Sequence, residues 1–359
     1  MRKSGANVIV CPAFVDVHVH LREPGRPDKE TIRTGSLAAA SAGYTCICPM
    51  PNLDPVPDCR ENLEQELELI RRDACIQVLP YASITMGRKG LETVDFESLK
   101  DSVVAFSDDG SGVQDSAVML RAMESAKALD CILAAHCEDN RYGTSPESEW
   151  KQIERDLELA ARTGCAYHVC HISTARSVEI IRQAKRSGVD VSCETAPHYL
   201  LLTQNEIRDE GRFKMNPPLR MPDDRDALIQ GLLDGTIDMI ATDHAPHTAA
   251  EKSLGLQGSA NGIVGLETAF PVLYTYLVRK GVITLERLVE LMSTAPRKRF
   301  RLGEAPLDTA TMDLDAVWTI DSSRFRSMGH STPFDGWEVY GRCLETRYKG
   351  KTVYAFDNE

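Results

Sequence analysis

The alternation of short apolar runs with longer helical stretches constrains the fold of this chain more than any other feature. Strand-like runs lie at residues 13–19, 44–49, 76–82, 103–107, 131–135, 166–170, 189–193 and 238–241. Helical patterns between them cover residues 29–41, 60–72, 116–129, 147–162, 175–187 and 223–233. Strands joined by crossovers of helical length form a parallel sheet, and eight such strands close into a barrel. We therefore predict an α/β fold, a (β/α)8 barrel, with an open doubly wound sheet as the alternative.

The length of 359 residues accommodates one large domain and a small appendage. Barrels of about 250 residues fold as single domains, so the chain need not be divided into several modules. We expect an amino-terminal remnant at residues 1–12, the barrel at 13–305 and a carboxyl-terminal β appendage at 306–359. Residues 264–278 and 284–293 look helical, and residues 95–100 form a possible short helix.

Composition excludes several classes of protein. Hydrophobic residues make up 42% and charged residues 26%, as in globular proteins with a sizeable core. The net charge of -12 opposes a nucleic-acid partner, which would require a concentrated positive patch. The 11 cysteines are scattered without a C-x-x-C pair, so we interpret them as reduced thiols. Without a signal peptide or an apolar span of about 20 residues, we expect a cytoplasmic protein with no membrane contact.

The first predicted strand ends in the sequence Asp16-Val17-His18-Val19-His20. Residues i and i+2 of a strand point to the same face, so the two imidazoles project into one space. Two such histidines can chelate zinc. Taken alone, the pair fits a buried or surface role equally well.

Other candidate ligands follow other strands at the same end. They are Asp108 and Asp109 after the fourth strand, His136 after the fifth, His171 after the sixth and Asp243 after the eighth. In a β/α barrel these carboxyl ends open on one face, where active sites are assembled. Four histidines and two aspartates meeting there predict a metal centre, and a shared carboxylate could bridge two ions about 3.5 to 4 Å apart.

Several longer motifs carry a resemblance to a known family. They read FVDVHVHLREPG from Phe14, AFSDDG from Ala105, AHCEDN from Ala135, YHVCHIST from Tyr167, KMNPPLR from Lys214, ATDHAPH from Ala241 and NGIVGLETAFP from Asn261. With these motifs the chain resembles bacterial dihydroorotases of the amidohydrolase superfamily from about residue 14 to residue 354. The pairing of HVHLREPG with KMNPPLR separates this family from the similar allantoinases and dihydropyrimidinases.

The resemblance implies two zinc ions per chain. By motif, His18, His20 and Asp243 resemble the ligands of the first zinc, and His136 and His171 those of the second. Many members of the superfamily bridge the metals with a carboxylated lysine on the fourth strand. Residues 103–109 contain no lysine, which resembles the branch that uses an aspartate. We expect Asp109 to bridge, with Asp108 as the alternative.

The resemblance also implies the substrate, dihydroorotate or N-carbamoyl-L-aspartate, and a reversible reaction whose ring-closing direction serves pyrimidine biosynthesis. Asp243 would carry a proton between the attacking oxygen and the ring nitrogen. Arg22 lies two residues after His20, so it faces the same space and can grip the substrate carboxylate in a bidentate way. The resemblance adds further substrate contacts, namely His20, Asn52, Asn216, His247, Asn261 and Gly262.

Further polar residues near these motifs have open roles. We expect His168 to pack in the barrel wall, because it cannot share a face with His171 under strict alternation. His198 follows the seventh strand and is at best behind the ligands, while His244 could orient Asp243 or belong to a loop. A thiolate ligand from Cys137 or Cys170 is a minor alternative. Residues 248–262 could close over the substrate or form a mobile connection.

The chain departs from the family at two places. About a dozen residues precede Phe14, where family members carry several strands that pair with the carboxyl-terminal ones, and the region after AHCEDN is short. A reduced appendage, a homo-oligomer such as a dimer, or a start placed too far downstream would each account for the first departure. Alternatives to a dihydroorotase are another cyclic amidase, acting on hydantoin or allantoin, and an inactive partner of aspartate carbamoyltransferase.

Overall fold

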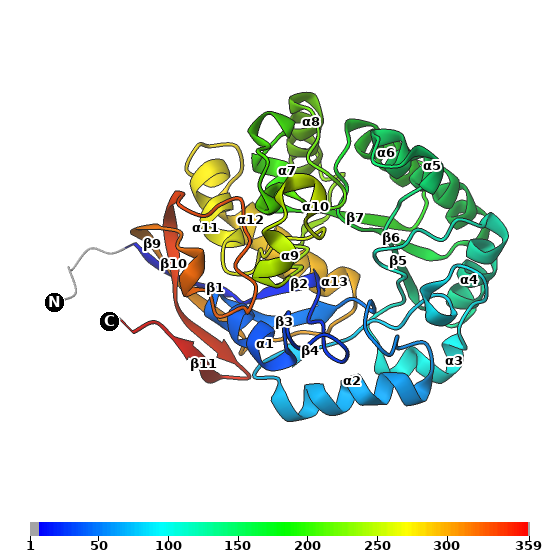
Figure 1. The fold of residues 1–359 in the computed structure, drawn as a ribbon, viewed down its shortest axis with the longest axis horizontal. Helices are drawn as coiled ribbons and strands as arrows, with labels where there is room; N and C mark the ends of the chain where they lie inside the picture. Colours follow the sequence, from blue (N-terminus) through cyan, green and yellow to red (C-terminus); the bar gives the residue numbers. More distant parts are fainter. Residues whose placement is uncertain (1–6, 358–359) are drawn as a thin grey trace.

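The strands of the computed structural model, which describes residues 7–357, form two parallel sheets and one antiparallel sheet (Figure 1). The parallel sheets have the orders β2-β3-β4 and β5-β6-β7-β8. The barrel strands are β2 (Phe14–Val19), β3 (Tyr44–Pro49), β4 (Gln77–Val78), β5 (Ile132–Ala135), β6 (Ala166–Val169), β7 (Val191–Thr195) and β8 (Met239–Ile240). This topology confirms the predicted α/β barrel with a β appendage.

Single bridges join the two parallel sheets. On one side, Phe106 bridges in parallel to Ala82, after β4, and to Leu133 in β5. On the other side, Val19 bridges to His244, and the His20 amide donates to the His244 carbonyl over 2.8 Å. The expected fourth strand at residues 103–107 is therefore reduced to one bridged residue, because its neighbours adopt loops on either side of Phe106.

The helices of the barrel lie between its strands and largely match the predicted stretches. They are α1 (Ile32–Ser41), α2 (Arg60–Asp73), α3 (Phe96–Leu99), α4 (Ser116–Ala128), α5 (Pro146–Thr163), α6 (Ala175–Arg186), α7 (Pro197–Leu201) and α8 (Pro222–Leu233). Local signals define their ends. The α5 helix starts with Pro146 in its first turn and stops at Gly164, whose φ of 69° suits glycine. Thr174 caps α6 by accepting a hydrogen bond from the Ser177 amide.

Helices beyond β8 are short. They are α9 (Ala249–Lys252), α10 (Gly255–Gly258), α11 (Ala269–Leu273), α12 (Leu285–Val289) and α13 (Ala295–Arg299), with single π-turns at Tyr274–Val278 and Glu290–Thr294. The helix expected from residue 264 begins only at Ala269, because residues 264–268 follow a backbone turn behind the barrel mouth. Within residues 7–357, no helix is both long and apolar enough to cross a membrane.

The appendage is an antiparallel sheet of order β1-β9-β10-β11, formed by β1 (Val8–Pro12), β9 (Thr309–Thr319), β10 (Glu338–Tyr348) and β11 (Lys351–Ala355). The short segment before Phe14 predicts that the carboxyl-terminal strands lack an amino-terminal partner, and this prediction is wrong for β9. Residues from Val8 to Pro12 pair with β9 in a continuous register, so one edge of β9 is covered. Phe14 then packs against Tyr44 and stacks on Phe270, and Phe270 lies against Gly341 of β10, which joins the barrel to the appendage.

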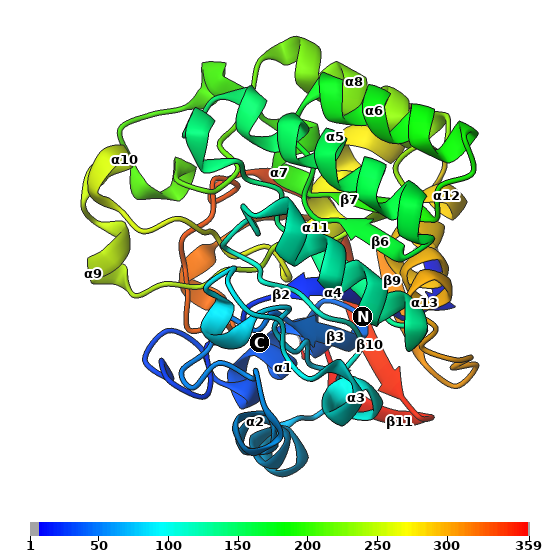
Figure 2. The ribbon, with the colours of Figure 1, turned by 90° about the vertical axis from the view of Figure 1, so that its right-hand side faces the viewer.

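Figure 2 separates the two ends of the barrel, with α9 and α10 on one side and α12 and α13 on the other. The α9–α10 side is the end onto which the carboxyl ends of the strands open, since both helices follow β8 directly.

Candidate metal centre

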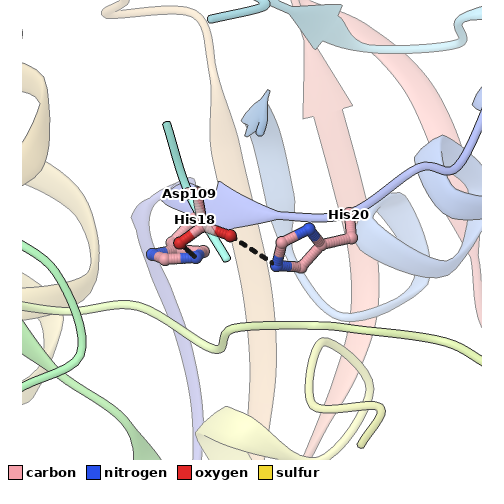
Figure 3. Close-up of side chains that lie close together, drawn as sticks. All are labelled: His18, His20 and Asp109. Atoms are coloured by element: carbon pink, nitrogen blue, oxygen red, sulfur yellow. Dashed lines mark ion pairs between the residues drawn. The ribbon is translucent and has the colours of Figure 1, made fainter. Parts of the chain in front are cut away.

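The histidines of the first barrel strand share one polar space. His18 and His20 are both buried, and their ring centroids lie 5.4 Å apart. Figure 3 shows both rings turned toward the carboxylate of Asp109. The Nε2 atom of His18 lies 3.4 Å from Asp109 Oδ1, and the Nε2 atom of His20 lies 3.6 Å from Asp109 Oδ2. The i, i+2 spacing therefore places both imidazoles as expected.

Asp243, in the segment that follows β8, adds a carboxylate to this group. Its Oδ1 atom lies 3.0 Å from His20 Nε2 and 3.5 Å from His18 Nε2. One carboxylate oxygen thus faces both histidines of β2, which is the arrangement expected of a shared ligand or of a base next to one.

His136 and His171 form a second group around the same aspartate. Nδ1 of His136 and Nε2 of His171 are 2.9 Å apart, and they lie 3.7 Å and 3.6 Å from Asp109 Oδ1. The sets His18–His20–Asp109 and Asp109–His136–His171 each bring their ligand atoms within 4.8 Å of one another. Asp109 belongs to both sets.

The neighbouring aspartates of the fourth strand have different tasks. Asp108 turns away and accepts hydrogen bonds from the backbone amides of Ile84 and Thr85, at 2.8 Å and 3.0 Å, and from the Thr85 hydroxyl. Asp109 faces the histidines. Between the two candidates for a bridging carboxylate, the geometry favours Asp109.

The donor set fits a metal. Imidazole nitrogens with carboxylate oxygens are the ligands that zinc prefers. Among residues 7–357, the buried atoms His18 Nε2 and Asp109 Oδ1 have no hydrogen-bond partner, although an unsatisfied buried polar atom is costly. A cation between these atoms would satisfy both.

Charges inside the site shift the pKa values of its groups in opposite directions. Burial opposes ionisation of Asp109, but the nearby His18, His171 and His20 hold its pKa well below the usual range. Burial likewise opposes the charge on His18, yet Asp109 and Glu194 raise its pKa. Burial and the charge of Arg22 lower the pKa of His20. The carboxylates therefore stay ionised and available as ligands at neutral pH.

The backbone adopts left-handed conformations at three of these residues. The φ angles are 59° at Arg22, 32° at His171 and 49° at Asp243. Side chains other than glycine rarely take such values, and the cost is of order 1 to 3 kcal/mol each. Strain of this kind is concentrated at functional sites, which agrees with the chemistry assigned to these positions.

Two glutamates that no sequence pattern indicated contact the outer ring nitrogens of predicted histidine ligands. Glu194 Oε1 lies 2.6 Å from His18 Nδ1, and its other oxygen lies 3.1 Å from His168 Nε2. Glu138 Oε2 lies 2.7 Å from His136 Nε2. Carboxylates in this position fix the tautomer and orientation of a ligating histidine. Only their positions in the sequence could have indicated this role. Glu194 lies near the end of the seventh strand, and Glu138 lies two residues after His136.

A cavity of about 160 Å³ opens at the site. All seven expected substrate contacts line it, and they are His20, Arg22, Asn52, Asn216, His247, Asn261 and Gly262. Arg22 donates from Nε to the Pro246 carbonyl and has a terminal nitrogen 3.4 Å from His247 Nε2. Burial lowers the pKa of Arg22 to about 10, and burial with the nearby Arg22 and Lys29 lowers that of His247 to about 3. A charged guanidinium beside a neutral imidazole can receive an anionic group.

The asparagines of the rim are tied to the histidines. The Asn52 side-chain oxygen lies 2.8 Å from His20 Nδ1. Asn216 donates to Glu138 over 2.9 Å, and the Asn261 carbonyl lies 2.7 Å from His247 Nε2. Asn52 and Asn216 are thus bonded to the predicted ligands His20 and His136, whereas Asn261 is bonded to the substrate contact His247.

Three further histidines lie behind the cavity. His168 bonds to Ser192 Oγ over 2.8 Å and to Glu194, as expected of a residue in the barrel wall. His198 is fully buried, and its pKa is lowered to about 4 chiefly by burial. His244 lies 3.3 Å from Glu30 and accepts the Gly265 amide, so it anchors the turn after Asp243.

The two cysteines beside the ligands do not replace them. Cys170 forms a possible ligand group with His18 and Glu194, on the side of the His18 ring that faces Glu194. Burial raises the pKa of Cys170 to about 12 and that of Cys137 well above its usual range. Both thiols are therefore protonated at neutral pH without a metal, and Cys137 Sγ contacts the Ala135 carbonyl and the Tyr167 hydroxyl instead of the ligand groups.

The chain is similar to known proteins over nearly its whole length. A family model described as "Dihydro-orotase-like" matches residues 7–148. The dihydroorotase of Geobacillus thermodenitrificans is 49% identical over 96% of this chain and 87% of its own length. The dihydroorotase of Anoxybacillus flavithermus is 50% identical with the same coverage of both chains.

Solved structures share the fold over nearly the whole chain. The L-hydantoinase (dihydropyrimidinase) of Arthrobacter aurescens has a TM-score of 0.88 and 26% identity, covering 97% of this chain and 85% of its own. The dihydropyrimidinase of Brevibacillus agri has a TM-score of 0.86 at 22% identity, covering 99% and 88%, and shows the fold alone. On sequence, the chain belongs to the dihydroorotase family of cyclic amide hydrolases.

Proposed function

We propose that this chain is a two-zinc dihydroorotase that interconverts N-carbamoyl-L-aspartate and (S)-dihydroorotate in pyrimidine biosynthesis. The observation that carries the proposal is the pair of ligand groups that share Asp109. His18, His20 and Asp243 would hold one zinc, and His136 and His171 the other. Asp109 would bridge them, since its carboxylate faces both groups.

The residues divide the chemistry between them. Two zinc ions in this site would lower the pKa of a water molecule and polarise the ring carbonyl of the substrate. Asp243 is suited to move the proton, because its carboxylate is ionised and lies 3.0 Å from His20 Nε2 at the cavity wall. It would accept a proton from the attacking oxygen and donate it to the departing ring nitrogen. In the biosynthetic direction the same proton transfers run in reverse.

The cavity rim would bind the rest of the substrate. Arg22 would pair with the carboxylate, with Asn52 and His247 beside it. On the other side, Asn216 and the backbone of Asn261 and Gly262 would contact the ring. His20 lines the same cavity and would contact both the metal and the substrate.

Further parts of the proposal concern organisation. We divide the chain into an amino-terminal segment at 1–12, the barrel at 13–305 and the appendage at 306–359. Among the described residues, Val8–Pro12 supply the β1 strand to the appendage. A homodimer and a cytoplasmic location remain predictions, as does association with aspartate carbamoyltransferase. Exposed apolar residues of the appendage, such as Val10 and Val317, are consistent with a dimer contact.

A substrate comparison tests this function. Purified native chain is assayed with dihydroorotate, hydantoin and allantoin, beside Asp243→Ala and a control, Asp226→Ala, which removes an exposed aspartate of α8. We expect turnover of dihydroorotate in the native chain and the control, and its loss in Asp243→Ala. Turnover of hydantoin or allantoin without dihydroorotate would favour another cyclic amidase, and bound zinc without any turnover would favour an inactive partner.

A further inference from the structure

A buried lysine lies beneath the rim of the cavity. Lys252, the last residue of α9, has only 9% of its surface exposed. Its ammonium donates to three backbone carbonyls, those of Gly262 at 2.7 Å, Ala260 at 2.8 Å and Lys214 at 3.1 Å. A buried charge is stable only when it is paired or hydrogen-bonded, and these three acceptors match its three donors.

The three carbonyls belong to the two segments that present substrate contacts. Gly262 and the residue before it, Asn261, line the cavity, and Lys214 is two residues before Asn216. The Gly262 amide donates to the Lys214 carbonyl over 3.0 Å, so the two segments run side by side. Lys252 therefore fixes the separation of the groups expected to contact the substrate ring.

The residue before Lys252 fixes the opposite side of the cavity. Glu251 lies 2.8 Å from Lys29 Nζ and 3.6 Å from His247 Nδ1. Lys29 in turn lies 3.2 Å from His247 Nδ1. Consecutive, oppositely charged residues of one short helix thus reach the carboxylate-binding side and the ring-binding side of the same cavity. Figure 2 shows α9 at the open end of the barrel, where such a connection is possible.

The packing around Lys252 leaves it little freedom. A Cβ atom at Gly211 would collide with the Lys252 carbonyl oxygen and with Ser259 Oγ, so this contact requires glycine. The capping box between Thr248 and Glu251 holds the start of α9. Burial lowers the pKa of Lys252 to about 8, with the charge of Lys214 as a smaller cause.

We propose that Lys252 is a positioning residue for substrate binding, and that residues 248–262 form a fixed clamp over the cavity instead of an opening lid. This inference rests on the proposed function, because it assigns Asn216, Asn261 and Gly262 to the substrate. Lys252 itself does not line the cavity. It acts through the three carbonyls, which hold the ring-binding groups in place before the substrate arrives.

Steady-state kinetics with a matched variant test the positioning role. Lys252→Met keeps the length of the side chain but removes all donors. The control Lys280→Met removes an exposed lysine that does not line the cavity. For Lys252→Met we expect KM for dihydroorotate to rise by roughly 10-fold to 100-fold, with kcat changed less than about 3-fold and zinc content unchanged. The control should keep the native KM.

An unchanged KM in Lys252→Met would overturn the proposal, and so would a loss of kcat together with zinc. Amide hydrogen exchange in the native chain tests the clamp without any variant. We expect slow exchange at Ala260 and Gly262, whose amides donate to the Glu251 and Lys214 carbonyls, before dihydroorotate is added. Fast exchange that becomes slow only with dihydroorotate would show a lid. If the native chain lacks turnover, the proposed function fails while the exchange result still decides the clamp.

Discussion

The mouth of the barrel leaves some buried polar atoms without protein partners, whereas the four-stranded sheet pairs its polar backbone groups with one another. At the mouth, His171 and Asp243 have strained backbones, and buried atoms of His18 and Asp109 lack hydrogen-bond partners among the described residues. In the sheet, β9 pairs with β10 over most of its length and with β1 from Thr309 to Asp313, and its buried side chains Ala310, Met312 and Leu314 are apolar. The mouth is therefore organised for a ligand at the expense of stability, and the sheet for stability alone.

The largest expected effect separates the two adjacent aspartates of the mouth. In Asp109→Asn we expect turnover to fall by roughly 10²-fold to 10⁴-fold and zinc to be lost, because the proposed bridging charge is removed. The melting temperature without metal should fall, because the nearby histidines that lower the pKa of Asp109 stabilise its charge in the folded state. In Asp108→Asn most of the turnover should remain, because this residue binds backbone amides. Equal losses in both variants would contradict the distinction.

A change at the junction of barrel and sheet should have the reverse effect. Phe14 is fully buried between Tyr44 and Phe270, with ring centroids 5.5 Å and 5.4 Å away. We expect Phe14→Ala to lower the free energy of unfolding by about 3 to 5 kcal/mol, because it leaves a cavity. In urea unfolding the midpoint should shift, while kcat per folded molecule stays native. A fall in kcat of the folded fraction would show that the two regions are coupled.

A variant of Glu194 tests whether a carboxylate bonded to a ligating histidine contributes to metal binding at the mouth. In Glu194→Gln we expect zinc affinity to weaken by roughly 10-fold to 100-fold, because His18 loses its charged partner at Nδ1. Competition with a chelator measures this affinity. Glu158→Gln, on the exposed face of α5, serves as the control. Native affinity in Glu194→Gln would limit its role to packing with His168.

The smallest expected effect is a pH dependence at the edge of the appendage. Burial raises the pKa of Glu267 from 4.5 to about 7, although the Arg326 and Ser327 amides donate to it. The folded state then binds more protons than the unfolded state between these values, so stability falls as pH rises from about 5 to 7. In Glu267→Gln this part of the decline should vanish, shifting the melting temperature by a few degrees near pH 7. Identical melting profiles over this range would refute it.

The sequence predicts the mouth better than its supports. Strand alternation places His18 and His20 on one face, and the barrel topology brings His136, His171 and Asp243 to the same end. The role of Glu194 could not be assigned from the sequence, because its contact with His18 forms only when the barrel closes and β7 comes close to β2. The choice between Asp108 and Asp109 similarly depends on which way the loop after Phe106 turns.

Outside the mouth, short pairing segments limit what a pattern can predict. Residues 103–107 have the apolar composition of a strand, but only Phe106 forms bridges. Residues 8–12 form a strand because β9 offers an edge about 300 positions later, which no local pattern records. Residues 248–262 look like a mobile loop by composition, yet Lys252 and Glu251 hold them through contacts distant in sequence.

The most direct test of the account is a zinc titration of metal-free chain, followed by dihydroorotate turnover at each addition. The shared Asp109 predicts that turnover rises with zinc, reaches its full value at about two ions per chain and is lost again with a chelator. Full turnover in the metal-free chain, or two bound zinc ions without turnover of dihydroorotate, would contradict it.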